Sequence, residues 1–164
     1  MIKYIVIKKE RLAYIAGLFD GEGYIRIAKD IYRIKLRLRR NPTYSVRIGI
    51  SMCNPYAIKY IFDNFDGSIH KMRSSRAKPN HRTLYGWIAT SKKAYAFLTA
   101  IRPWLIVKAE EADIAIEFQK HIDSTKRWPI QGKPKGFSSH PQTIIDYRES
   151  IFQKLSQLKV KHFS

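Results

Sequence analysis

The sequence is poor in cysteine and has no long apolar run. Its single cysteine, Cys53, excludes an internal disulfide framework and favours a reducing, intracellular setting. No apolar run approaches the roughly 20 residues that a membrane-spanning helix needs. The N-terminal segment MIKYIVIKKERL lacks the small-residue cleavage site of a secretory signal. These absences predict a protein that works inside the cell and does not cross a membrane.

Acidic residues are also scarce. Only 13 Asp and Glu stand against 31 Lys and Arg, which gives a net charge of +18 and a pI near 10.1. Such a surface attracts polyanions over several ångströms, so nucleic acid is the expected partner and an anionic membrane the second choice. A basic structural protein of the ribosomal kind stays open at this point, because net charge alone does not distinguish it.

The composition is otherwise that of a folded domain. Hydrophobic residues make up 45% and aromatic residues 13% of 164 positions, enough for one domain with a real core. No internal repeat or low-complexity block is present. Asn and Gln are sparse while Ile is abundant, which points weakly to a thermophilic host.

Hydrophobic periodicity predicts an alternation of helices and strands. Gly21 and Gly23 are expected to break the first helix, Asn54-Pro55 to start the second, and Ser91 to cap the third. The expected helices cover residues 10–19, about 55–66, about 92–102, from near 104–108 to about 121, and about 141–159. The expected strands start at residue 24 and span about 45–51, 68–74 and 82–90. The resulting α-β-β-α-β-β-α-α order predicts an α+β domain whose antiparallel sheet has helices on one side.

Period-two alternation separates two faces of this sheet. Ile25, Ile27 and Ile31 should point into the core together with Val46, Ile48 and Ile50, which leaves an arginine-rich opposite face. In the last helix the expected buried residues are Ile144, Tyr147, Ile151, Leu155 and Leu158. Residues 123–142 are rich in Pro, Gly, Ser and Lys and are expected to form a long loop.

The segment Ile15-Ala-Gly-Leu-Phe-Asp-Gly-Glu-Gly23 carries the chemistry. Ala13 and Gly17, four residues apart, let another helix approach closely. Asp20 and Glu22 stand at a helix C-terminus, where the macrodipole disfavours negative charge, so helix stability does not explain them. Carboxylates in such a place, beside a basic face, suggest a cation between them and a phosphate backbone.

This nonapeptide resembles the signature of the LAGLIDADG homing endonucleases. The family's αββαββα core matches the predicted order, so the resemblance covers about residues 10–122. It implies an antiparallel sheet that forms a saddle for DNA, with residues 1–122 as the endonuclease core and 123–164 as a basic loop and helical extension. One copy of the signature implies a homodimer in which the signature helices of two chains pack together through Ala13, Ala16 and Gly17.

By position in the signature, the resemblance makes Glu22 the catalytic metal ligand, with Gly21 beside it as a backbone ligand. The family usually has Asp where this chain has Glu22, which is a mild departure. Asp20 becomes a structural or interface acid. The alternative for Glu22 is a solvated carboxylate at a helix end.

The segment Arg102-Pro-Trp-Leu-Ile-Val-Lys108 looks like the family segment whose closing lysine reaches the active site. Lys108 would then polarise the attacking water or stabilise charge on the phosphate, unless it is an ordinary phosphate-contacting or exposed lysine. Members often place Gln or Asn at the end of the second strand to hold water. Met52 stands there and cannot do so, which leaves Ser51 or Asn54 as substitutes.

The face opposite the apolar side is expected to contact DNA, because arginine can bond guanine in the major groove while other contacts reach only phosphates. A plain solvated face is the alternative. The expected contact residues are Tyr24, Arg26, Ala28, Asp30, Tyr32, Arg33, Ser45, Arg47, Gly49, His70, Met72, Arg73, Arg82 and Tyr85.

The resemblance implies a Mg²⁺-dependent endodeoxyribonuclease that cuts both strands of a long, nearly palindromic site and leaves short 3′ overhangs. Mn²⁺ or Ca²⁺ could substitute for binding. Two rivals stay open: an RNA-binding splicing maturase on the same fold, and a non-enzymatic DNA- or RNA-binding module. Intron-encoded members occur in archaea and organelles, and the sparse amides favour an archaeal cytoplasm over an organelle matrix or stroma.

Overall fold

The computed structural model describes residues 7–31, 33–34, 37–38, 42–72, 82–126, 128–129 and 138–161. Its element order contains the predicted αββαββα core and the appended helix. The elements that build the core are α1 (Lys9–Glu22), β1 (Gly23–Asp30), β4 (Thr43–Met52), α2 (Pro55–Phe65), β5 (Ser68–Met72), β6 (Leu84–Thr90), α3 (Ser91–Ile101), the 3₁₀ turn η1 (Arg102–Trp104), α4 (Ala109–Ser124) and α5 (Gln142–Lys161). Two short ladders flank it, β2 (Arg33–Ile34) with β3 (Arg37–Leu38) and β7 (Trp128–Pro129) with β8 (Ser138–Ser139).

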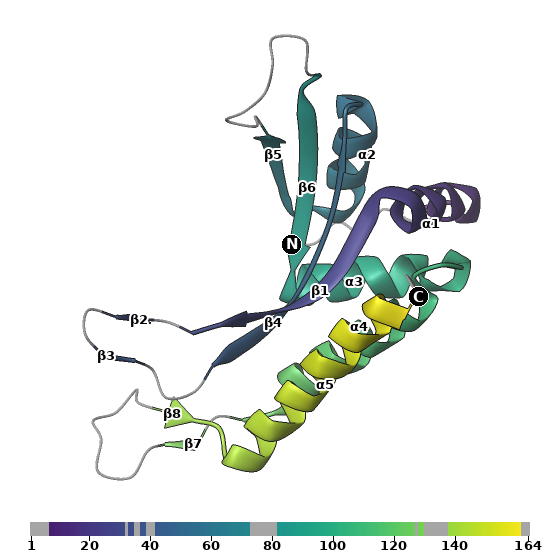
Figure 1. Cartoon of the computed structure of the whole chain (residues 1–164). Coiled ribbons are helices and arrows are strands. Elements are labelled where there is room, and N and C mark those ends of the chain that lie inside the picture. Colours follow the sequence, from purple (N-terminus) through teal and green to yellow (C-terminus); the bar gives the residue numbers. More distant parts are fainter. Residues whose placement is uncertain are drawn as a thin grey trace.

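The central sheet has the order β1-β4-β6-β5, and each neighbouring pair is antiparallel. Figure 1 shows the helices gathered along one side of this curved sheet. Together these features confirm the predicted α+β class. No helix in the described part of the chain is long and apolar enough to cross a membrane. The division into residues 1–122 and 123–164 stays a prediction.

Alternation along the strands sorts their side chains as predicted. Ile25 on β1, Ile48 on β4 and Trp87 on β6 are fully buried on the helix side of the sheet. The register pairs Ile25 with Ile48 and places Ile50 beside Trp87, so these side chains share one face. Ile31 was expected to join them but is 57% exposed. The prediction is wrong because β1 ends at Asp30, and alternation has no meaning beyond the strand.

An aromatic cluster joins the helices to the sheet. The ring of Phe97 on α3 lies 5.1 Å from Phe19, 4.8 Å from Phe65 and 4.8 Å from Trp87, so it contacts α1, α2 and β6 at once. The Trp87 indole donates a hydrogen bond to the Asp66 carbonyl at 2.7 Å, which satisfies the one polar atom of this core residue. The cluster fixes where α1 ends relative to the sheet.

Helix boundaries show where local signals succeed and fail. The Asn54 side chain accepts a hydrogen bond from the Tyr56 amide at 2.9 Å, which confirms the predicted start of α2. Gly21 does not break α1, which runs on to Glu22 and ends at Gly23. Gly23 is needed there, since a Cβ would lie 2.4 Å from the Phe19 ring. The expected Ser91 cap is also wrong, because Thr90 precedes the helix and its side chain makes no capping bond.

The later helices differ in detail from the prediction. The turn η1 ends at Trp104, and α4 begins at Ala109, one residue after the expected start near residues 104–108. In α5 the most buried residues are Ile145, Arg148 and Leu155. Tyr147 was expected on the buried side but is 37% exposed, with its ring 4.5 Å from that of His121. Leu155 is buried and Ile151 and Leu158 pack against the core as predicted, so the expected stripe fails mainly at Tyr147.

A polar network ties α5 to the sheet at the end of β1. The Glu149 carboxylate accepts hydrogen bonds from the Tyr44 hydroxyl and from Gln153 at 3.0 Å, and pairs with Lys29 at 2.8 Å. Burial and the bond to Glu149 raise the pKa of the Tyr44 hydroxyl. The bonds from Lys29, Tyr44 and Gln153 lower the pKa of Glu149 from 4.5 to about 2. Glu149 is therefore ionised in the folded protein near neutral pH.

Replacing Glu149 by glutamine is expected to flatten the acid dependence of stability. A group whose pKa falls on folding contributes stability above its unfolded value, and this stability is lost as pH falls through the folded value. For Glu149 that window runs from about pH 4.5 down to about 2. Urea unfolding at several pH values should show a smaller loss for Glu149→Gln across this window. Glu117→Gln, which changes an exposed acid of α4, should keep the wild-type slope; equal slopes for all three proteins would contradict the assignment.

Candidate functional site

Two carboxylates stand in the last turn of α1. Asp20 is half-buried and Glu22 is exposed. The C-terminal end of a helix carries partial negative charge and carbonyl groups without intrahelical partners. Both acids therefore lie where the helix alone disfavours them, and their surroundings must supply the compensation.

Asp20 is compensated by the segment that precedes α4. Its carboxylate accepts hydrogen bonds from the backbone amides of Ile106 at 2.8 Å, Val107 at 3.2 Å and Lys108 at 2.9 Å. Three amide donors on one carboxylate fix the backbone of this segment against the end of α1. Asp20 thus has its acceptors engaged within the chain.

The side chain of Lys108 also contacts the C-terminal end of α1. Its ammonium group donates a hydrogen bond to the backbone carbonyl of Asp20. The structure therefore brings Lys108 and the acidic turn of α1 together, although they are far apart in the sequence. Glu22, by contrast, makes no hydrogen bond or ion pair with another described residue, and its carboxylate is open to solvent.

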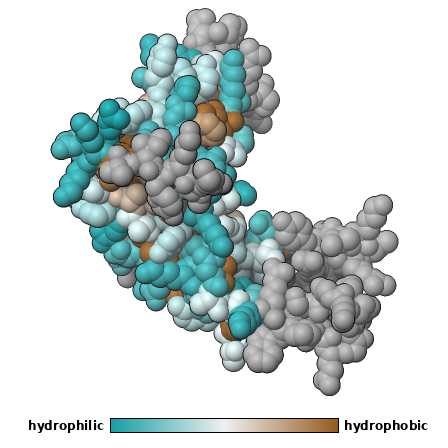
Figure 2. All heavy atoms as spheres, turned by 180° about the vertical axis from the view of Figure 1, so that it is seen from behind, coloured by the Kyte–Doolittle hydropathy of each residue, from teal (hydrophilic) through white to brown (hydrophobic). Residues whose placement is uncertain are grey.

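The sheet leaves its other face open beside this turn. The register pairs Tyr24 with Gly49, Arg26 with Arg47, and Ala28 with Ser45, all directed away from the helices. On β5, His70 is paired with Gly86 and lies on the same face. Figure 2 shows the molecule hollowed along one side, where hydrophilic residues predominate. The open face also carries residues that the sequence analysis missed, among them Ser68, Ile88 and Thr90.

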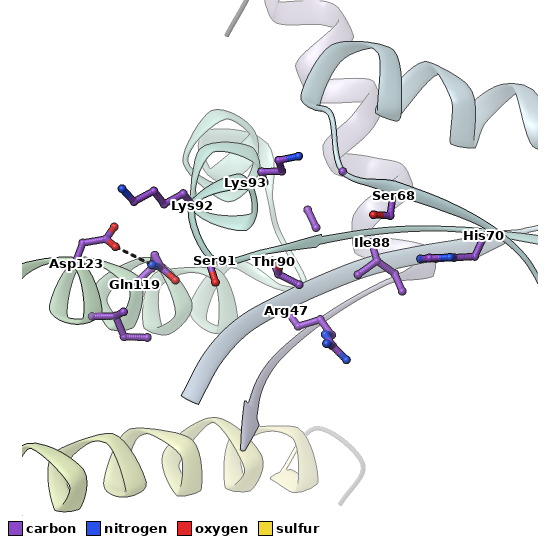
Figure 3. Close-up of a pocket in the computed structure, with 13 residues that line it drawn as sticks. Arg47, Ser68, His70, Ile88, Thr90, Ser91, Lys92, Lys93, Gln119 and Asp123 are labelled. Carbon is purple, nitrogen blue, oxygen red and sulfur yellow. Dashed lines mark hydrogen bonds between the residues drawn. The ribbon is translucent and has the colours of Figure 1, made fainter. Parts of the chain in front are cut away.

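A groove of about 810 Å³ continues this face to the ends of two helices. Figure 3 shows Arg47, His70 and Thr90 on the strands, with Lys92 and Lys93 at the start of α3 and Gln119 and Asp123 on α4. Lys93 pairs with Asp66 at 2.6 Å, and Asp123 accepts a hydrogen bond from Gln119 at 3.1 Å. Arg47, Lys92 and Lys93 line the groove with one carboxylate, Asp123, so cationic side chains predominate in it.

No family model matches the sequence, and no curated protein matches it either. Solved structures do. The homing endonuclease I-CvuI in complex with a DNA target superposes with a TM-score of 0.67 at 14% identity, over 92% of this chain and 82% of that one. The archaeal intron-encoded homing endonuclease I-Vdi141I, complexed with DNA, has a TM-score of 0.55 at 17% identity, over 90% and 98%. The LAGLIDADG homing endonuclease I-GzeII, in complex with its DNA target, has a TM-score of 0.59 at 14% identity, over 86% and 43%.

The chain has the LAGLIDADG homing endonuclease fold. The resemblance of its signature segment and the superposition of its structure agree on this fold, although sequence identity is low. The signature helix is α1, and its closing acid, Glu22, is the last residue of that helix.

Two of the expected contact residues do not fit a LAGLIDADG saddle in this chain. Tyr85 pairs with Met52 and packs on the core side, so its assignment to the open face is wrong. Gly49 lies on the open face but is covered, because the Tyr24 ring is folded over it and a Cβ would lie 2.7 Å from that ring. Arg82 is exposed ahead of β6, beside Cys53 and Tyr56.

Several other expected contacts fall outside the described residues. Tyr32 and Arg73 are not described, and for Arg33 and Met72 the structure describes the strand but not the side chain. These four stay predictions.

An apolar residue, Met52, occupies the position where the resemblance to the family leads us to expect a water-holding side chain. Met52 closes β4 and packs partly against the core. Of the two substitutes, Asn54 is already engaged, because its side-chain oxygen accepts the capping bond from Tyr56. Ser51, the other substitute, lies on the open face opposite Gly86.

The outer side of α1 is open. Gly17 is exposed, and a Cβ built on it would have nothing within 4 Å. Tyr14 beside it is 56% exposed, and Ile106 and Val107, held by Asp20, are 86% and 66% exposed. Ala16 must be removed from the predicted packing surface, because it is fully buried in the chain's own core.

Exchanging Asp20 for asparagine is expected to lower the free energy of unfolding by about 2 kcal/mol, because an amide group replaces a charged acceptor of three backbone donors. Urea unfolding at neutral pH measures this loss. Asp63→Asn is the matched control: its carboxylate pairs with exposed Lys59 at 2.6 Å, and it should lose about 0.5 kcal/mol or less. If the two variants lost the same stability, the Asp20 bonds would not organise the site.

Proposed function

We propose that this chain is a site-specific endonuclease that hydrolyses both strands of duplex DNA as a homodimer. One observation carries the proposal: an exposed carboxylate, Glu22, ends the signature helix beside Lys108 and at the margin of an arginine-bearing open sheet face. The neighbours I-CvuI, I-Vdi141I and I-GzeII, which share the fold, are DNA complexes of homing endonucleases. A net charge of +18 supports a polyanionic substrate.

Two copies are proposed because one chain provides only half of a site. Among the described residues, no group of three or more His, Cys, Asp or Glu side chains could hold a metal ion. Glu22 is one carboxylate, and two chains would bring two. The chain spans 98% of I-Vdi141I but 43% of I-GzeII, so it corresponds to a single fold unit. The open side of α1 around Tyr14 and Gly17 supplies a surface for the second copy.

The donor set fits a hard divalent cation such as Mg²⁺. Glu22 offers a carboxylate without a partner among the described residues, and the last carbonyls of α1 at Gly21 and Glu22 are oxygen donors at the negative end of a helix. Structures of I-CvuI with DNA were obtained with Mg and with Ca. When bound, the cation would activate water and stabilise the leaving oxygen.

The chain's own residues would position the scissile phosphate. Asp20 fixes the segment that carries Lys108, and the Lys108 ammonium group is held at the end of α1 by its bond to the Asp20 carbonyl. A cation held there would stabilise charge that develops on the phosphate. The resemblance adds the finer proposals: a long, nearly palindromic site and short 3′ overhangs.

A second candidate is an RNA-binding splicing maturase on the same fold. Met52 favours it, since an apolar side chain stands where members often hold water for the reaction. The two candidates differ in whether duplex DNA is cut. An archaeal cytoplasm as the setting stays a prediction.

Glu22→Gln is expected to reduce cleavage to background while DNA binding in Ca²⁺ stays near the wild-type level, since the change removes a metal ligand and leaves the open face intact. A randomised duplex library, incubated with Mg²⁺ and sequenced at the cut ends, gives the cleavage readout, and filter binding gives affinity. Glu117→Gln serves as the control and should cleave normally. Cutting by Glu22→Gln would reject the role of Glu22, and binding without cutting by the wild-type protein would favour the maturase.

A further inference from the structure

Two arginines face each other across the open side of the sheet. The antiparallel register of β1 and β4 pairs Arg26 directly with Arg47. Like charges in this relation destabilise a sheet, because the side chains are only about 5 Å apart at their bases. The pairing of two cations does not stabilise the free protein, so we expect a bound partner to account for it.

The pair is not neutralised within the described part of the chain. No carboxylate there forms an ion pair with Arg26 or Arg47. The Nε atom of Arg47 is buried and has no hydrogen-bond partner among the described residues. Unsatisfied guanidinium donors are unfavourable, and exposed Arg26 and partly exposed Arg47 keep donors that no carboxylate of the described residues neutralises, so a bound partner could supply acceptors to the accessible ones.

Arg26 is pre-oriented by an aromatic neighbour. Its guanidinium carbon lies 5.7 Å from the centroid of the Tyr24 ring. That ring is itself folded over Gly49 on the adjacent strand, where only glycine leaves room for it. A guanidinium group held on a ring loses less side-chain freedom when it binds, so the arrangement favours a defined hydrogen-bonding direction.

The position of the pair favours base edges over phosphates. β4 is an interior strand of the sheet, and Arg47 stands between Arg26 on β1 and Thr90 on β6. The Lys92 side chain lies outward of this position, at the start of α3 (Figure 3). A duplex held against the open face turns a groove towards the interior strands and its phosphate backbones towards such outer cations.

We propose that Arg26 and Arg47 read two consecutive guanines in the major groove of each half of the target. The inference rests on the proposed function and names part of its recognition sequence. An arginine fork bonds guanine O6 and N7 together. Neighbouring base pairs rise about 3.4 Å, a spacing that two side chains based about 5 Å apart can match. A two-fold symmetric dimer would then require the guanine step twice, in inverted orientation.

The experiment is a binding selection in Ca²⁺ from a randomised duplex library, with sequencing of the bound fragments. The wild-type protein should enrich two adjacent guanines in each half-site. Arg26→Gln and Arg47→Gln should each lose the preference at one of these positions, with a loss of about 5- to 150-fold in affinity for the selected site. Arg47→Lys should also lose the preference, because lysine keeps the charge but lacks the fork.

Two matched variants separate base reading from general attraction. Lys92→Gln should weaken binding to all sequences alike and leave the sequence preference unchanged. Lys154→Gln, which removes an exposed cation of α5, should change neither affinity nor preference. Thermal unfolding should show that Arg26→Gln and Arg47→Gln fold as stably as the wild type or more so, since they relieve the repulsion.

Three results would overturn the inference while leaving the proposed function intact: no paired guanines in the wild-type selection, an unchanged preference in Arg47→Lys, or a uniform weakening by both glutamine variants. The last would make the pair a phosphate contact. Failure of the wild-type protein to bind duplex DNA would instead remove the proposed function together with this inference.

Discussion

The candidate site depends on one carboxylate that does no chemistry. Asp20 binds three consecutive backbone amides, and through them it joins the end of the signature helix to the segment before α4. Without this junction, Lys108 would have no fixed place near Glu22, and the apolar side chains of Ile106 and Val107 would not be held beside α1. These three bonds therefore fix the backbone that carries Ile106, Val107 and Lys108 against the end of α1, beside the exposed Glu22.

The aromatic cluster around Phe97 packs against α1, the helix that carries Asp20. It contacts α1, α2 and β6 and sets the position at which α1 gives way to β1. Because the helices cover only one side, the opposite side of the sheet is free to carry cations. The core and the open, cationic surface are thus two faces of the same strands, and the alternation of side chains keeps the buried apolar residues apart from the exposed polar ones.

The sequence predicted what depends on local patterns. Period-two alternation gave the buried side of β1 and β4, and Asn54-Pro55 gave the start of α2, since each signal acts over a few residues. The failures depend on long-range contacts. The partners of Asp20 are 86 to 88 residues away. Tyr85 is an exception, because Trp87 and Ala89, which alternate in step with it on β6, are buried, so alternation alone places Tyr85 on the core side. Gly21 stayed helical, and α1 ends only at Gly23, where a close contact with Phe19 leaves no room for a side chain.

The folding of the Tyr24 ring over Gly49 has a consequence for how such a protein could acquire a new target. Gly49 lies in the middle of the open face, yet it is not a free position, because any larger residue displaces the ring on which Arg26 rests. Residues 24, 26 and 49 must therefore vary as a group, whereas Ser45 and His70 can change singly. Evolution or redesign of specificity would have to change residues 24, 26 and 49 of β1 and β4 together, whereas positions elsewhere on the face could change one at a time.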